Sequence, residues 1–203
     1  MGNTKLKDAE NRFIIDTATR LFLGSSIDKV TMADIAREVG IGEATLYRRY
    51  STKQRIVLEC ATALCEEVYT RFRKPADGKN GFEQLEQFYN TFLEIFEDNP
   101  QFYAFIYRFD LMIVDLPESE LGSYESEIDN FRYLFHDAYT LGLRDGSVKE
   151  VDELPFYYST THALLNLCKK LTCQGELISQ DRAINKADEV RTLIDIVLYR
   201  LQA

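Results

Sequence analysis

The stretch TMADIAREVGIGEATLYRRYSTKQRIV, residues 31–57, determines the fold that this sequence predicts. Thr31 and Asp34 have the spacing of a helix N-terminal capping box, in which a hydroxyl accepts a hydrogen bond from a free backbone N–H. Gly40 then ends the first helix, because glycine adopts a positive φ at little cost. After Gly42, a second short helix is predicted over residues 43–49. The stretch therefore predicts two short helices joined by a tight glycine turn.

Apolar side chains are expected to hold these two helices together, with Ile41 buried between them. Ser51 and Gln54 have the spacing of a second capping box, which predicts the start of a long helix over residues 52–73. The apolar side chains on the two short helices and the turn are Ile35, Ala36, Val39, Ile41 and Leu46, and those of the long helix are Val57, Ala61, Leu64, Val68 and Phe72.

Helical periodicity accounts for most of the remaining sequence. The sequence contains no convincing strand pair and no internal repeat, so the predicted fold class is all-α. We expect an N-terminal three-helix helix-turn-helix domain over residues 1–54 and a C-terminal helical domain over residues 55–203. The further helices are expected near 8–24, 82–98, 100–114, 120–142, 153–175 and 182–202.

Charge is distributed unevenly along a chain whose net charge is −9. Residues 1–55 contain ten Lys/Arg and seven Asp/Glu, a net of +3, whereas residues 75–203 have a net of −12. A basic end on an acidic body is suited to presenting that end to phosphate. An acidic protein with an uneven surface charge gives the same numbers, so charge alone leaves both interpretations open.

Several function classes are not supported by the sequence. It has no GxSxG, P-loop or HExxH motif, so we expect no enzyme, no cofactor and no metal site. The cysteines are two pairs spaced five apart, which suits reduced, buried thiols rather than a metal or redox site. The N-terminus lacks an apolar signal segment, and no run approaches the ~18 apolar residues of a membrane span, so a cytoplasmic protein without a membrane partner is expected. These cysteines are Cys60, Cys65, Cys168 and Cys173.

The second short helix has residues suited to DNA reading. Small side chains at Ala44 and Thr45 would let the backbone approach the bases, and Arg48 could pair with guanine. Tyr47, Arg49 and Lys53 suit phosphates, as does the N-terminus of the helix that follows Ser51. A helical hairpin with a solvated basic face would have the same features, so this pattern alone does not establish DNA binding.

The complete pattern resembles the N-terminal domain of the tetracycline-repressor (TetR) family. The resemblance extends back to about Arg12, whereas the rest of the chain is similar only in length and helical character. It implies a DNA-binding transcriptional regulator. The residues that carry the resemblance are Thr31, Ile35, Ala36, Gly40, Thr45, Leu46, Tyr47, Tyr50 and Lys53.

By family position, Thr31, Tyr47, Arg49 and Lys53 resemble phosphate contacts. Three positions depart from the family pattern: Ser26 replaces a glycine, Gly42 replaces a Ser or Thr N-cap, and Ala33 is too short for a long base contact. Glu43 could accept from cytosine or only favour the helix dipole. The positions that face bases in such proteins are Ala33, Glu43, Ala44, Thr45 and Arg48.

The C-terminal domain is rich in aromatic residues, and the resemblance implies that its central helix, 100–114, borders an effector pocket. Because that helix is apolar around most of its circumference, it should be buried all round or line a cavity. Arg108 and Asp110 would then need a partner or a ligand, unless they lie at an exposed edge or in an ion pair. The aromatics could equally be ordinary core. The candidate effector residues are Phe88, Phe92, Phe105, Tyr107, Asp110, Phe135, Tyr158 and His162.

The last two helices carry apolar residues on more than one face, which predicts a homodimer with a four-helix interface. Such a dimer would place two recognition helices ~34–36 Å apart on double-stranded DNA with a near-palindromic operator. The candidate dimerisation residues are Leu164, Leu167, Leu171, Val190, Ile194, Val197 and Leu201.

The predicted function is a repressor that a small hydrophobic or aromatic effector releases from its operator. The effector would bind a form of the dimer whose DNA-binding domains are splayed, and the long helix over residues 52–73 would link these domains to the pocket. The alternative is a TetR-like architectural or division-type DNA-binding factor without a small-molecule effector.

Overall fold

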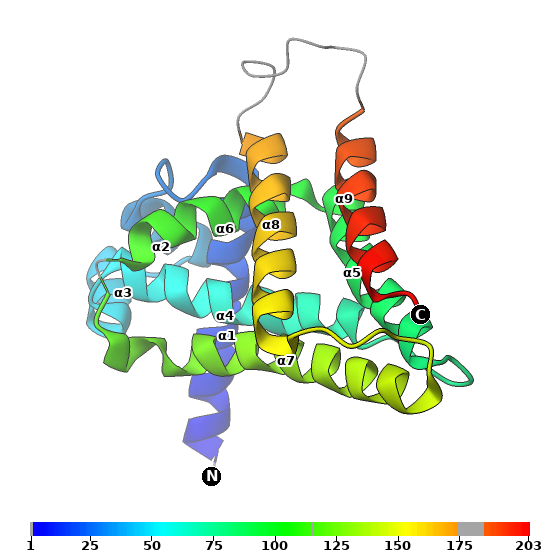
Figure 1. The fold of residues 1–203 in the computed structure, drawn as a ribbon. Coiled ribbons are helices and arrows are strands. Elements are labelled where there is room, and N and C mark those ends of the chain that lie inside the picture. The colour runs from blue at the N-terminus through cyan, green and yellow to red at the C-terminus, as the bar shows by residue number, and fades with distance from the viewer. Residues whose placement is uncertain (1, 115, 174–184) are drawn as a thin grey trace. The chain divides into compact units, whose positions relative to one another are not determined.

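The computed structural model describes residues 2–114, 116–173 and 185–203, and these residues form nine α-helices (Figure 1). The all-α prediction is confirmed. Residues 174, 175 and 182–184, which the sequence assigns to the last two predicted helices, lie outside the described residues. The helices are α1 (Gly2–Ser25), α2 (Met32–Val39), α3 (Glu43–Tyr50), α4 (Lys53–Phe72), α5 (Gly81–Asp98), α6 (Pro100–Ile113), α7 (Glu118–Asp145), α8 (Glu153–Cys173) and α9 (Lys186–Leu201).

The chain divides into two compact units. The first unit comprises residues 1–65 and 104–125, and the second comprises residues 66–103 and 126–203. The first unit thus contains most of α6 and the start of α7 in addition to the helix-turn-helix. The functional division expected between residues 54 and 55 stays a prediction.

The first unit has an apolar interior to which both chain segments contribute. Phe22 of α1 and Phe105 of α6 have ring centroids 6.3 Å apart, and Phe109 contacts Tyr124 at 4.9 Å. Arg108 forms an ion pair with Asp28, as one of the alternatives for this charge predicted. The α6 helix is not buried all round, however.

Two large apolar residues are exposed at the end of α6: Leu111 lies within the helix and Val114 directly follows it. The side chains of Leu111 and Val114 are 66% and 82% exposed. The sequence expectation that this helix is enclosed on every side is therefore wrong. Leu111 lies two residues beyond Phe109, which is fully buried, so the exposed side is nearly opposite the packed one.

Two turns of the first unit differ from their sequence patterns. Ser26, at the position of the family glycine, adopts a φ of +115°, so the glycine-type turn is retained by a residue with a side chain. The predicted Ser51–Gln54 capping box is wrong. Ser51 instead ends α3 with a φ of +57°, and the Thr52 hydroxyl accepts a hydrogen bond from the Arg55 N–H at 3.4 Å.

The second unit packs α5, α8 and α9 against one another (Figure 1). Aromatic rings fill its interior, and Phe88 and Phe135 each contact several other rings at centroid distances of 5.1–6.5 Å. The C-terminus is held by the backbone, since the Lys149 N–H donates to the Leu201 carbonyl at 2.7 Å.

The first turn of α5 approaches α7 at two glycines. A Cβ atom built on Gly81 would lie 2.0 Å from the backbone nitrogen of Gly142 and 2.7 Å from the Ala138 carbonyl oxygen. Backbone atoms cannot move aside as a flexible side chain would. The approach of these two helices therefore depends on a missing side chain at Gly81.

We predict that Gly81→Ala lowers the free energy of unfolding by ~1–3 kcal/mol or more, because the added methyl overlaps backbone atoms. Gly122→Ala is the matched control, since Gly122 is also helical and has no atom within 4 Å of a built Cβ. The control should gain up to ~1 kcal/mol from helix propensity. Urea unfolding followed by circular dichroism measures both, and equal stabilities for the two variants would contradict the close approach.

Candidate nucleic-acid interface

The start of α2 is fixed by the predicted capping box. The Thr31 hydroxyl accepts a hydrogen bond from the Asp34 N–H at 3.1 Å, and the Asp34 carboxylate accepts from the Thr31 N–H at 3.0 Å. Hydrogen bonds from the Thr31 hydroxyl and backbone, followed by one from Arg37, lower the pKa of Asp34 to about 2. Asp34 is therefore ionised near neutral pH, as the positive end of a helix favours.

Gly40 makes the turn between α2 and α3. Its φ is +80°, and the N–H groups of Gly40 and Ile41 both donate to the Ala36 carbonyl at 3.0 Å. Ile35 and Leu46 are fully buried, so they hold the two helices together as predicted. Ile41 is only half-buried, which corrects the expectation of a buried residue between the helices.

The α3 helix buries two residues, half-buries one and exposes the other five. Leu46 and Tyr50 are buried, whereas the Tyr47 side chain is 45% exposed. Gly42, its N-cap, makes no side-chain capping hydrogen bond. The predicted contact positions that are exposed are Thr31, Ala33, Glu43, Ala44, Tyr47, Arg48 and Arg49, and Thr45 and Lys53 are half-buried.

Two predicted phosphate contacts are engaged within the first unit. The Lys53 ammonium donates to the carbonyls of Ile27 at 2.7 Å and Val30 at 2.9 Å, so it fastens the loop between α1 and α2 to the start of α4. The Arg49 guanidinium is bound by two side chains of α1. In this structure, the contacts of Lys53 and Arg49 are thus to other residues of the first unit.

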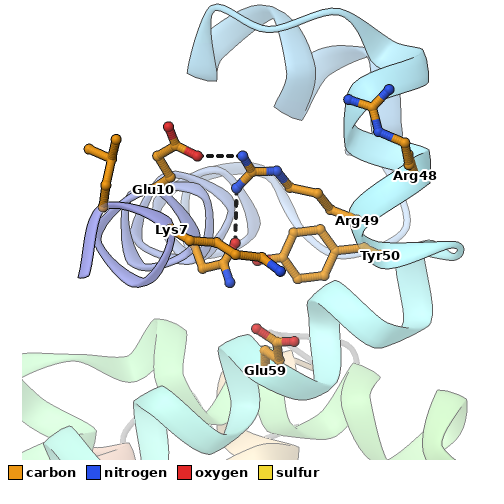
Figure 2. Close-up of a pocket in the computed structure, with 8 residues that line it drawn as sticks. Lys7, Glu10, Arg48, Arg49, Tyr50 and Glu59 are labelled. Carbon is orange, nitrogen blue, oxygen red and sulfur yellow. Dashed lines mark hydrogen bonds and ion pairs between the residues drawn. The ribbon is translucent and has the colours of Figure 1, made fainter. Parts of the chain in front are cut away.

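A cleft of about 540 Å³ opens beside Arg49, between α1, α3 and α4 (Figure 2). The Tyr50 hydroxyl in its wall is buried and has no hydrogen-bond partner among the described residues. Burial raises the pKa of Tyr50 to about 12, and partial burial also raises the pKa of Glu59. The α1 residues of this cleft were missed by sequence analysis, because they lie almost forty positions before their partner.

The candidate effector residues are divided between the two units, five in the second and three in the first. Phe88, Phe92 and Phe135 are buried in the ring cluster of the second unit, and Tyr158 and His162 are exposed on α8 with ring centroids 5.7 Å apart. The other three, Phe105, Tyr107 and Asp110, belong to the first unit. Asp110 is exposed, as one of the alternatives for this charge predicted. The grouping of all eight as one effector pocket stays a prediction.

All seven candidate dimerisation residues belong to the second unit, and five of them are buried in its core. Leu167 and Leu171 are half-buried, so they retain some accessible surface. Burial in the chain's own core leaves the other five without surface for a second copy, which corrects their assignment. These five are Leu164, Val190, Ile194, Val197 and Leu201.

Within the described part of the chain, no cluster of three or more His, Cys, Asp or Glu side chains is placed to hold a metal ion. In that same part, no helix has the length and apolar character needed to cross a lipid bilayer. Cys60, Cys65 and Cys168 are buried, as the sequence predicts, whereas Cys173 is only half-buried.

Comparison with known proteins gives matches over the helix-turn-helix and over most of the chain. The model of the bacterial regulatory proteins of the tetR family matches residues 14–60. The HTH-type transcriptional repressor KstR2 of Rhodococcus jostii is 27% identical over 160 residues, which cover 77% of this chain and 77% of that protein.

Solved structures share the fold over nearly the entire chain. A transcriptional regulator from Saccharomonospora viridis, in complex with choline, has a TM-score of 0.73 at 17% identity and covers 97% of this chain and 99% of its own. The ketosteroid transcriptional regulator KstR2 of Mycobacterium tuberculosis has a TM-score of 0.64 at 16% identity, covering 95% of both chains.

Proposed function

The chain belongs to the TetR family of bacterial regulatory proteins, and on this premise we propose that it is a transcriptional repressor whose α3 helix enters the major groove of its operator. The observation that carries the proposal is the exposed face of α3, held at a fixed angle to α2 by the glycine turn at residue 40. Such a helix pair is the geometry by which helix-turn-helix proteins read base edges.

The exposed residues of α3 divide into base and phosphate contacts. Arg48 is exposed and has no side-chain partner among the described residues, so its planar fork is available to guanine. Ala44 is small and lies on the outer face, where it allows close approach to the bases. The Tyr47 phenol suits phosphate oxygens, which add affinity without sequence choice. The Thr31 hydroxyl donates to the Asp34 carboxylate at 2.6 Å, so it would have to release that bond to donate to a phosphate.

We also propose that the repressor is a homodimer on a near-palindromic operator. The support is an exposed apolar face on α9, where Ile196 and Tyr199 are 62% and 82% exposed and lie three residues apart, on one side of the helix. Leu154 and Tyr158 of α8 are also exposed, at 49% and 43%. These four residues replace the buried ones as the proposed dimer contacts.

A small hydrophobic or aromatic effector that weakens operator binding is the proposed signal. Its support is the aromatic content of the second unit, together with the KstR2 relative that is described as a ketosteroid transcriptional regulator. The rings around Phe88 pack edge to face at 5.1–6.0 Å, as in a filled core, which favours the alternative of a DNA-binding factor without an effector.

Two α3 variants test DNA reading. We expect Tyr47→Phe to weaken binding to a specific duplex and to a scrambled duplex by a similar factor of about five, since it removes a phosphate hydrogen bond. Arg48→Ala should weaken only the specific duplex, by ~1–3 kcal/mol, and should relax sequence choice. Gel-shift titrations at fixed salt measure both.

Arg73→Ala is the control for these variants, because Arg73 is an exposed arginine of the second unit. It should bind like wild type. If both α3 variants bind the specific duplex as tightly as wild type and distinguish it equally well from the scrambled duplex, the assignment of Tyr47 and Arg48 as DNA contacts is refuted.

The dimer face is tested by Ile196→Asp, which places a charge in the proposed apolar interface. We expect sedimentation equilibrium to find a dimer for wild type and a monomer for this variant, with unchanged circular dichroism. Leu143→Asp is the control and should remain dimeric, since Leu143 is 42% exposed on α7, a helix that carries none of the four proposed contacts. A variant at Ile196 that remains dimeric would contradict this face.

Effector binding is tested by thermal shift with a polycyclic steroid and with choline. A ligand at one hundred times its dissociation constant stabilises the folded protein by ~2.7 kcal/mol, which is a readily measured shift. We expect the steroid to raise the melting temperature and to weaken binding to the operator. If neither compound has either effect, the factor without an effector is favoured.

A further inference from the structure

The recognition helix is attached to α1 by a three-residue contact that we call the α1–α3 clamp, comprising Glu10, Asn11 and Arg49. Arg49 Nη1 donates to the Asn11 side-chain oxygen at 3.0 Å, and Arg49 Nη2 forms an ion pair with the Glu10 carboxylate. Figure 2 shows the Arg49 side chain directed toward α1, whereas Arg48 lies apart from the α1 side chains. The clamp thus uses both terminal nitrogens of one guanidinium.

This arrangement differs from what a phosphate contact requires. The Arg49 side chain is 27% exposed, and its Glu10 partner is 49% exposed, so the acid is the more accessible of the two. A DNA phosphate that approached Arg49 would meet a guanidinium whose two terminal nitrogens already bind a carboxylate and an amide, and whose charge the carboxylate already offsets. Arg48, the preceding residue, has no such competitors within the described chain.

Besides the Gly40 turn and its packing against α2, the α3 helix has little that fixes its orientation. It is eight residues long, has no side-chain N-cap, and buries only Leu46 and Tyr50. A helix this short depends on tertiary contacts for its stability and angle. A planar guanidinium that binds two acceptors restrains direction as well as distance, which a single ammonium cannot do.

We propose that the α1–α3 clamp positions the recognition helix for DNA reading, with Glu10 and Asn11 as positioning residues and with Arg49 making no phosphate contact in the complex. This inference rests on the proposed function, because it assigns α1 a part in operator binding. It also assigns a favourable role to Glu10, an acid close to the DNA-binding helix. Electrostatic repulsion between the Glu10 carboxylate and DNA phosphates, taken alone, would make Glu10 unfavourable for binding.

The test measures operator affinity as a function of salt concentration for Arg49→Gln, Arg49→Lys and Glu10→Gln. Each phosphate contact contributes ~0.9 to the slope of log K against log salt. Positioning predicts that all three variants weaken specific binding about three- to tenfold while the slope stays at its wild-type value. The Lys variant should resemble Gln, because an ammonium keeps the charge but cannot restrain direction through two acceptors.

A double variant and a matched pair complete the experiment. Glu10→Gln with Arg49→Gln should be no weaker than either single change, since one interaction is lost in each case. The controls are Arg20→Gln and Glu38→Gln, which remove a more exposed ion pair, 3.7 Å long, between α1 and α2. Both should bind the operator like wild type, and thermal melting confirms that each variant is folded.

The contrary outcomes are distinct. A slope that falls by about 0.9 in Arg49→Gln, with normal affinity in Arg49→Lys and tighter binding in Glu10→Gln, would make Arg49 a phosphate contact that Glu10 obstructs. That result overturns the inference and leaves the proposed function standing. If the wild-type protein binds every duplex equally well, the proposed function is overturned, and this inference is overturned with it.

Discussion

At Gly40 the backbone adopts a φ of +80°, and both N–H groups of the turn donate to a single carbonyl of α2. This left-handed turn sets the angle between α2 and α3, and residues with a Cβ adopt it only at a cost. The burial of Ile35 and Leu46 and the exposure of Arg48 all depend on that angle. Without the turn, α3 would be a short basic helix whose orientation relative to α2 is not defined.

Basic residues of the first unit serve two different purposes. Lys53 binds loop carbonyls, Arg49 binds α1 and Arg108 binds Asp28, so these cations stabilise the arrangement of helices. Arg48 is exposed and has no such partner among the described residues. Net basic charge in the sequence therefore overstates the charge available to phosphate. The affinity for DNA depends on fewer side chains than composition suggests.

Local sequence signals predicted the helices well, whereas contacts between distant residues were not predictable. The Thr31 capping box and the Gly40 turn follow from residues three or four apart, so their spacing is visible in the sequence. The Arg49 contact with Glu10 joins positions 39 apart, and no periodicity indicates it. Apolar periodicity also could not separate a core face from a partner face, which is why Ile194 was assigned to a dimer interface and is buried in the chain's own core.

The most direct test of the account is selection of duplexes from a random pool by the purified full-length chain at low ionic strength. The account predicts enrichment of a near-palindromic sequence whose two half-sites are centred about one helical turn, ~34–36 Å, apart. A pool that shows no enriched sequence after repeated rounds would contradict the claim that α3 reads bases. Binding that is equally strong to every duplex would contradict it as well.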